Sequence, residues 1–127
     1  MERESTAELG AWYPVHHGFE VQIRESGDEH HRTGAIYSLA KAAELPPQPP
    51  GGWRTMIITL RKSIVEVDVD GQRVCTFDSA AKDLPPRQKF YEPKREPRRP
   101  EVGYFGLQNH GPGELVWFKE VSVRTLD

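Results

Sequence analysis

Side chains that could exchange protons or hold a polar ligand gather at a few points of the sequence. Glu20 and Gln22 lie two residues apart in an alternating stretch, so on a strand both point to the same side. The stretch 108–111 brings two amides and His110 to a predicted strand end before a glycine, where a loop can carry them over a sheet face. Carboxylates and imidazoles act as general bases, and Glu20 and His110 are the two candidates for that role. The sequence has five histidines, and none lies in the predicted central hairpin: His16, His17, His30, His31 and His110.

The strongest local signal for an element that could position these groups lies in the middle of the chain. Residues 53–62 are rich in β-branched side chains, and residues 63–79 predict a hairpin with Asp70-Gly71 as its two-residue turn. A two-residue loop would pair Val69 with Gln72, Asp68 with Arg73, Val67 with Val74 and Val65 with Thr76. The three valines would then face the core, and Asp68 would form an exposed ion pair with Arg73.

Further strands are expected on both sides of this hairpin. Residues 18–24 alternate cleanly and residues 34–39 form a short apolar run. Residues 102–109 and 114–126 predict two more strands, with a β-bulge at Lys119-Glu120 where the apolar parity changes. About seven short strands, almost no helix and many Gly and Pro residues favour an all-β antiparallel sandwich or jelly roll.

Two segments fall outside the strand pattern. Residues 1–14 are expected to be irregular, with a short helix that Ser5 could cap and that Trp12, Tyr13 and Pro14 would end. Residues 84–100 contain five prolines and six Lys or Arg, which predicts a long, basic, mobile loop. The whole chain, residues 1–127, is interpreted as one domain.

Composition excludes several classes of protein. A net charge of −2 and a pI of about 6.2 argue against a nucleic-acid-binding protein. One cysteine, Cys75, allows neither an intrachain disulfide nor a cysteine-based zinc site. No apolar run has the length of a membrane span, and residues 1–10 carry no secretion signal, so the chain as given is expected to be cytoplasmic, or exported if a leader has been removed.

Four segments in order resemble one known family. They are GFEVQI at 18–23, HRTGAIY at 31–37, the stretch at 51–74, and GYFGLQNHG at 103–111 followed by the final predicted strand. Together they are similar to the 3-keto-disaccharide hydrolase domain, also called domain of unknown function 1080. The resemblance covers residues 15–127 and implies a concanavalin-like jelly-roll sandwich.

The chain departs from the family pattern at Arg54, at Asp70, and at its beginning. Arg54 and Asp70 each replace an Asn, and both keep polar or turn character. The N-terminal strands of the family are absent here. A sandwich short of strands would expose sheet edge and apolar surface, so the fold is expected to be incomplete or completed by a second chain, as a homodimer or higher oligomer.

The resemblance implies a carbohydrate substrate, and specifically cleavage of glycosides already oxidised to a ketone at C3. A base removes the C2 proton, the C1 substituent leaves, and water can add back. The expected catalytic residues are Glu20 and His110. Arg24 or Asn109 could hold the enolate oxygen, and a divalent metal bound by Glu20 and histidines is an alternative. The expected substrate-binding residues are Gln22, Arg24, His31, Tyr37, Gln108 and Asn109.

Two other functions are compatible with the sequence. The same fold also serves as a noncatalytic carbohydrate-binding module, and the chain could be a structural interaction domain. Glu20 and Gln22 could then be a solvated strand face, and Asn109-His110-Gly111 could be a simple turn.

Overall fold

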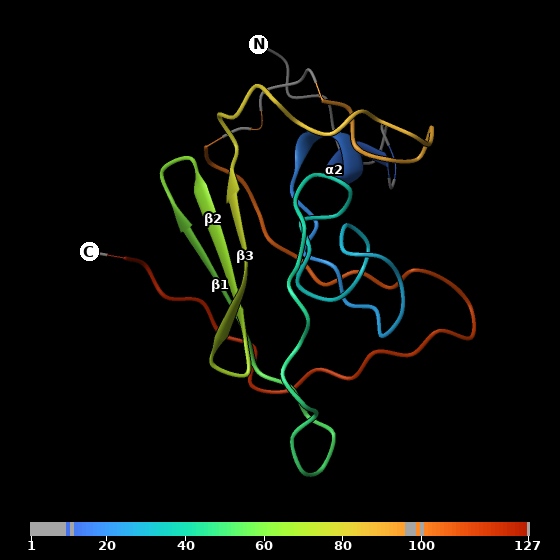
Figure 1. Cartoon of the computed structure of the whole chain (residues 1–127), viewed down its shortest axis with the longest axis vertical. Coiled ribbons are helices and arrows are strands. Elements are labelled where there is room, and N and C mark those ends of the chain that lie inside the picture. Colours follow the sequence, from blue (N-terminus) through green and yellow to red (C-terminus); the bar gives the residue numbers. More distant parts are fainter. Residues whose placement is uncertain (1–9, 11, 96–98, 100, 127) are drawn as a thin grey trace.

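Three antiparallel strands form the central sheet of the molecule. The computed structural model describes residues 10, 12–95, 99 and 101–126. Strands β1 (Met56–Arg61), β2 (Ile64–Val69) and β3 (Gln72–Asp78) lie in the order β1-β2-β3 (Figure 1). Apart from one six-residue helix, these strands are the regular structure of the described residues. The expected all-β class is confirmed, whereas a jelly-roll sandwich with two complete sheets stays a prediction.

The turn between β2 and β3 forms at Asp70-Gly71, as predicted. Asp70 has a φ of 50° and Gly71 a φ of 82°, the positive values that a two-residue type I′ turn needs. The Asp70 carboxylate also accepts hydrogen bonds from the Arg54 guanidinium at 2.6 Å and from the Thr55 N–H at 2.8 Å. The aspartate therefore joins the turn to the chain that leads into β1.

The hairpin register follows the prediction only next to the turn. Val69 pairs with Gln72 and Asp68 with Arg73, and the Arg73 guanidinium lies 2.7 Å from the Asp68 carboxylate. Beyond them the register shifts, so that Val67 pairs with Cys75 and Val65 with Phe77. The predicted Val67–Val74 and Val65–Thr76 pairs are wrong because Val74 is an extra residue in β3, as in a β-bulge.

This extra residue turns two consecutive side chains inward. Val74 and Cys75 are both buried, which a regular strand with strict alternation would not allow. A Cβ placed on Gly34 would lie 2.6 Å from a methyl of Val74, and Gly34 has a φ of 91°. The bulge at Val74 thus packs β3 directly against the backbone of residues 34–42, the segment that covers the sheet and that we call the covering segment.

The hydrophobic core lies between β2–β3 and residues 34–42. Val65, Val67 and Val69 are buried, as predicted from their alternation. Ile36 and Leu39 pack against them from the covering segment. Burying side chains of this size stabilises the fold by about 1.5–3 kcal/mol each.

The two segments at 18–24 and 34–39 pair with each other but form no continuous strands. Val21 and Ile36 make an isolated antiparallel bridge, and residues 20–24 exchange backbone hydrogen bonds with residues 33–37. Ser38, with a φ of 58°, ends this short ladder. Phe19 and Val21 pack on the core, so Glu20 and Gln22 point to the other side, as the alternation predicts.

Helix α2 (Trp12–His17) lies where an irregular segment was expected. That expectation is wrong for residues 12–14, because Pro14 falls in the first turn, where its missing N–H is not needed. Trp12 stacks on His16, and Tyr13 stacks on His17 with ring centroids 4.5 Å apart. The helix expected near Ser5 lies outside the described residues.

The proline-rich segment is folded onto the body as far as residue 95. Leu84 packs against the core, and Glu92 and Pro93 are buried. The Arg95 guanidinium donates to the Ser38 hydroxyl at 3.1 Å and to the Ser38 carbonyl at 3.0 Å. The prediction of a solvated loop is therefore wrong at Leu84, Glu92, Pro93 and Arg95, whereas residues 86–91 are exposed as it expects. We call residues 84–95 the proline-rich flap.

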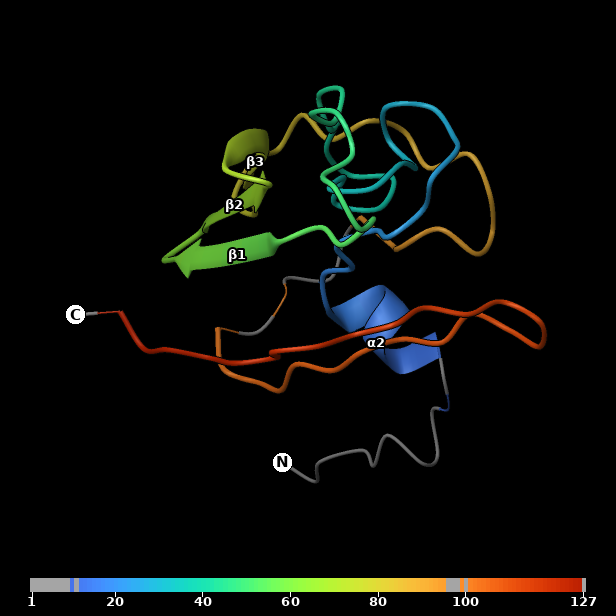
Figure 2. The same cartoon turned by 90° about the horizontal axis from the view of Figure 1, so that it is seen from below.

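Residues 101–126, which we call the C-terminal arm, extend along one side of the molecule, apart from the sheet (Figure 2). The strands predicted at 102–109 and 114–126 are not formed, because the arm has no hydrogen-bonded neighbouring strand among the described residues. Its apolar side chains are exposed, including Tyr104, Phe105 and Trp117. Glu120 has a φ of 54°, at the point where the sequence predicts a β-bulge. The described residues contain no helix with the length and apolarity that crossing a bilayer requires.

Candidate active site

A half-open pocket of about 340 Å³ lies beside the 20–24/33–37 ladder. Arg24, His31 and Tyr37, three residues predicted for the site, line it together. The ladder positions Arg24, because its N–H donates to the Thr33 hydroxyl at 2.7 Å and its carbonyl accepts from Thr33. The structure therefore brings these three predicted residues into one place.

Burial and several neighbouring groups act on the hydroxyl of Tyr37, which lines this pocket. Burial raises the pKa of its hydroxyl, and the neighbouring Tyr91, Glu20 and Glu92 raise it further, while Arg24 lowers it. The hydroxyl therefore stays protonated at neutral pH and can donate a hydrogen bond to a ligand. The Tyr37 N–H donates to the Glu20 carbonyl at 2.9 Å, so Glu20 lies directly across the ladder from Tyr37.

Glu20 combines partial burial with proximity to an imidazole. Burial raises the pKa of its carboxyl above the ordinary value, and the nearby His110 lowers it in part. A carboxyl with a raised pKa is a stronger base when ionised, which is the property that proton abstraction requires.

Neither Glu20 nor the remaining predicted residues line this pocket. His110 is exposed on the C-terminal arm, where its Nδ1 lies 2.7 Å from the Glu114 carboxylate. Gln108 and Asn109 precede it on the arm and are exposed as well. Gln22 is half-buried, and its backbone binds Ala35 and Gly34 across the ladder. These amides do not line the pocket that holds Arg24, His31 and Tyr37.

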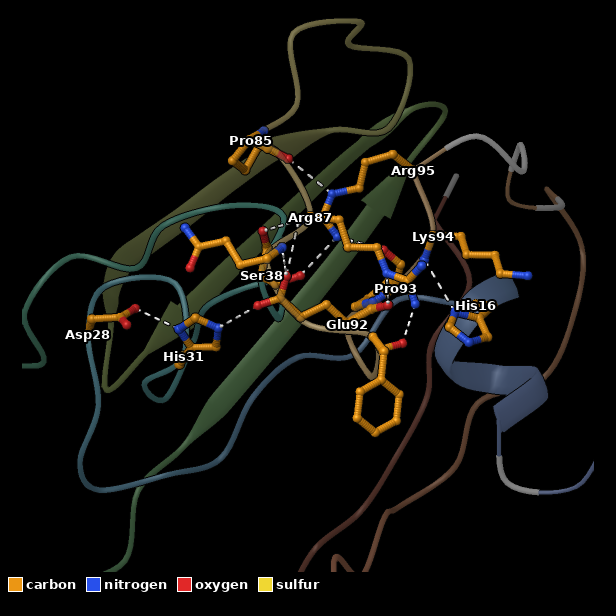
Figure 3. Close-up of polar contacts among 12 residues, drawn as sticks. His16, Asp28, His31, Ser38, Pro85, Arg87, Glu92, Pro93, Lys94 and Arg95 are labelled. Carbon is orange, nitrogen blue, oxygen red and sulfur yellow. Dashed lines mark hydrogen bonds and ion pairs between the residues drawn. The ribbon is translucent and has the colours of Figure 1, made fainter.

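His31 is held by acidic residues at both ring nitrogens. Its Nδ1 lies 2.7 Å from the Asp28 carboxylate, and its Nε2 lies 3.5 Å from the Glu92 carboxylate (Figure 3). The hydrogen bond from His31 is the main cause that lowers the pKa of Asp28. The Tyr37 ring meets the imidazole edge-on, with centroids 5.2 Å apart.

Sequence reasoning missed the contribution of the proline-rich flap. Four of its residues line the pocket: Gln88, Lys89, Tyr91 and Glu92. Burial raises the pKa of Glu92, but hydrogen bonds from the backbone at 88–89 and the charge of Arg95 outweigh burial, so the pKa is lowered and the side chain is ionised. The sequence carries no clear signal of this packing, because the flap is held by Leu84, Glu92 and Arg95, and its aromatic pair Phe90-Tyr91 is exposed.

The His, Cys, Asp and Glu side chains of the described residues do not form a cluster that could hold a metal ion. Within the described ranges, no three His, Cys, Asp or Glu side chains lie close enough together to hold an ion. Glu20 and His110 therefore belong to no such group among these residues.

Comparison with known proteins identifies the family. Residues 5–124 match the family described as the 3-keto-alpha-glucoside-1,2-lyase-like domain. The chain belongs to this family, which is the one that the four sequence segments indicate. No curated protein and no solved structure matches the chain.

Proposed function

We propose that the protein cleaves 3-keto-glycosides by removing the proton at C2 and expelling the C1 substituent. The C3 ketone acidifies the C2 proton, so a carboxylate base can abstract it as an enolate forms. The C1–O bond then breaks and a C1=C2 double bond remains. Addition of water to this enone completes a net hydrolysis.

Glu20 is the base in this proposal, and its half-buried carboxylate with a raised pKa is the observation that carries it. His110 is a poorer candidate, because its ring is exposed and already paired with Glu114. The nearby His110 lowers the pKa of this carboxyl in part. Arg24 and the Tyr37 hydroxyl line the adjoining pocket and can hold the enolate oxygen.

A noncatalytic carbohydrate-binding module is the second candidate. Tyr37 and Tyr91 line the same half-open pocket, and aromatic rings commonly stack on sugars. Such a module would bind a glycoside whether or not C3 is oxidised. It would also retain binding without any loss of substrate.

Incubation with a 3-keto-glucoside, followed by measurement of remaining substrate, separates the two candidates. We expect turnover by the natural sequence and a loss of about 100-fold or more for Glu20→Gln. His110→Ala should lose less, about tenfold, because it removes a neighbour of the base and leaves the base itself in place. Binding without turnover would favour the module, and a larger effect of His110→Ala would make the imidazole the base. A chelator titration in the same assay tests the metal alternative.

A further inference from the structure

The arrangement around His31 suits proton transfer to a ligand in the pocket. A carboxylate only accepts hydrogen bonds, so the 2.7 Å contact places a proton on Nδ1, which donates to Asp28. Nε2 is then the nitrogen that can exchange a proton. An aspartate that fixes the tautomer and orientation of an imidazole in this way is a recurring feature of acid–base sites.

Glu92 holds the other side of the ring from a fixed position. Its side chain is only 3% exposed, and its Oε2 accepts from the Gln88 N–H at 2.8 Å. The Arg87 guanidinium binds the Glu92 carbonyl at 3.0 Å, and Arg95 ties the same flap to Ser38 (Figure 3). Because this network fixes Glu92, the second carboxylate at His31 belongs to the folded structure of the flap.

His31 also has access to a ligand. Its side chain is 24% exposed, and it lines the pocket together with Arg24 and Tyr37. The 3.5 Å separation between Nε2 and the Glu92 carboxylate is long for a hydrogen bond. An oxygen of a bound ligand can therefore replace Glu92 as the partner of Nε2.

We propose that His31 is the catalytic acid that protonates the departing C1 oxygen, with Asp28 and Glu92 as its positioning residues. This inference rests on the proposed function. In the elimination, Glu20 takes the C2 proton, the C–H electron pair forms the C1=C2 bond, and the C1–O bond breaks. His31 acts from its doubly protonated form: Nε2 gives its proton to the leaving oxygen, and the ring becomes neutral with its remaining proton on Nδ1 towards Asp28. When water adds to the enone, His31 recovers a proton from it and Glu20 returns one to C2, so both groups regain their starting states.

Leaving groups of different acidity test this assignment. The two substrates are 4-nitrophenyl 3-keto-glucoside and methyl 3-keto-glucoside. Each is tested as the α and the β anomer. Nitrophenolate leaves without protonation, whereas methanol leaves only when its oxygen gains a proton. We expect His31→Gln to lose about 100-fold or more in kcat on the methyl glycoside and less than about tenfold on the nitrophenyl glycoside.

Other outcomes separate this inference from the proposed function. Glu20→Gln should lose activity on both substrates, because both need the base. Equal losses on both substrates for His31→Gln, or no loss on either, would overturn the role as acid while the proposed function stands. Absence of turnover of either substrate by the natural sequence would overturn the proposed function itself.

The positioning residues are tested with charge-removing variants. Asp28→Asn and Glu92→Gln should each lower kcat on the methyl glycoside with little change in KM, and should shift its pH profile. Glu25→Gln is the matched control, because Glu25 lies in the same loop as Asp28 but does not line the pocket. Asp28 is exposed, so its variant tests the inference even where Glu92→Gln fails to fold. An unchanged pH profile with an altered KM would contradict the positioning role.

Discussion

At the scale of single residues, Glu20 links activity to stability. Its folded-state pKa is raised mainly by burial, so ionising it costs more free energy in the folded protein than in the unfolded chain. The cost is absent below the unfolded pKa, grows as the pH rises towards the folded value, and is fully present above it. A base kept in this environment is destabilising at the pH where it works.

We therefore predict that Glu20→Gln stabilises the protein at neutral pH while it removes activity. The gain in melting temperature should be near zero at about pH 4, should increase through the pH window above the ordinary glutamate pKa, and should then level off. Thermal unfolding of both proteins across this range measures it. Glu25→Gln, at an exposed position, is the matched control and should leave the melting temperature at pH 7 close to that of the natural sequence. A Glu20→Gln protein that is less stable at pH 7 would contradict the prediction.

The residues of the site divide according to how far their contacts reach along the chain. Arg24, His31 and Tyr37 could be predicted because they lie on or beside one short ladder, where local alternation determines direction. Glu92 could not be predicted as a site residue. It contacts His31, which is 61 positions earlier in the sequence (92 − 31), and it lies in a proline-rich segment of a kind typical of solvated loops. Pattern alone does not show that a buried arginine–serine network will fold such a segment.

At the scale of elements, the contact between β3 and the covering segment depends on one glycine. A Cβ on Gly34 would lie 2.6 Å from the Val74 methyl, and a φ of 91° strains any residue with a side chain. We predict that Gly34→Ala destabilises the protein by about 1–3 kcal/mol or more. Denaturant unfolding measures the change.

Gly103→Ala is the matched control for this substitution. Gly103 lies on the C-terminal arm without a positive φ, and a Cβ there would meet nothing within 4 Å. Its replacement should change the free energy of unfolding by less than about 0.5 kcal/mol. Equal effects of the two substitutions would show that the Gly34–Val74 contact does not support the fold.

The strands themselves show what alternation can and cannot predict. The turn at Asp70-Gly71 and the inward valines of β2 follow from local chemistry, and both are confirmed. The pairing of β2 with β3 beyond Asp68 does not follow from local chemistry. The extra residue there, Val74, is favoured by its tertiary contact with Gly34. The arm has strand-like sequence but no partner strand, and a strand forms only where backbone partners exist.

At the scale of the whole molecule, two apolar surfaces remain uncovered. β1 is an edge strand, and Ile58 and Leu60 are exposed although they lie opposite the buried Val67 and Val65 on the core face. The C-terminal arm exposes a second apolar surface. We propose that a second copy of the chain covers these surfaces, because each copy carries both an unpaired strand edge and an unpaired extended segment.

This proposal predicts a homodimer or higher oligomer in solution. Leu60→Lys should dissociate it, because the charge would be buried in the contact, while Thr59→Lys on the opposite face of β1 should not. Size-exclusion chromatography with light scattering measures the mass of each protein. A natural sequence that is monomeric at all concentrations would contradict the proposal.

The buried cysteine in β3 provides a reporter of rare openings of the sheet. Cys75 is the one thiol of the sequence, it is 3% exposed, and burial raises its pKa. A thiol-specific alkylating reagent can modify it only when the sheet separates from its covering segment. The alkylation rate of the intact protein thus follows the frequency of that opening, without any engineered label, and should slow under conditions in which the copies assemble.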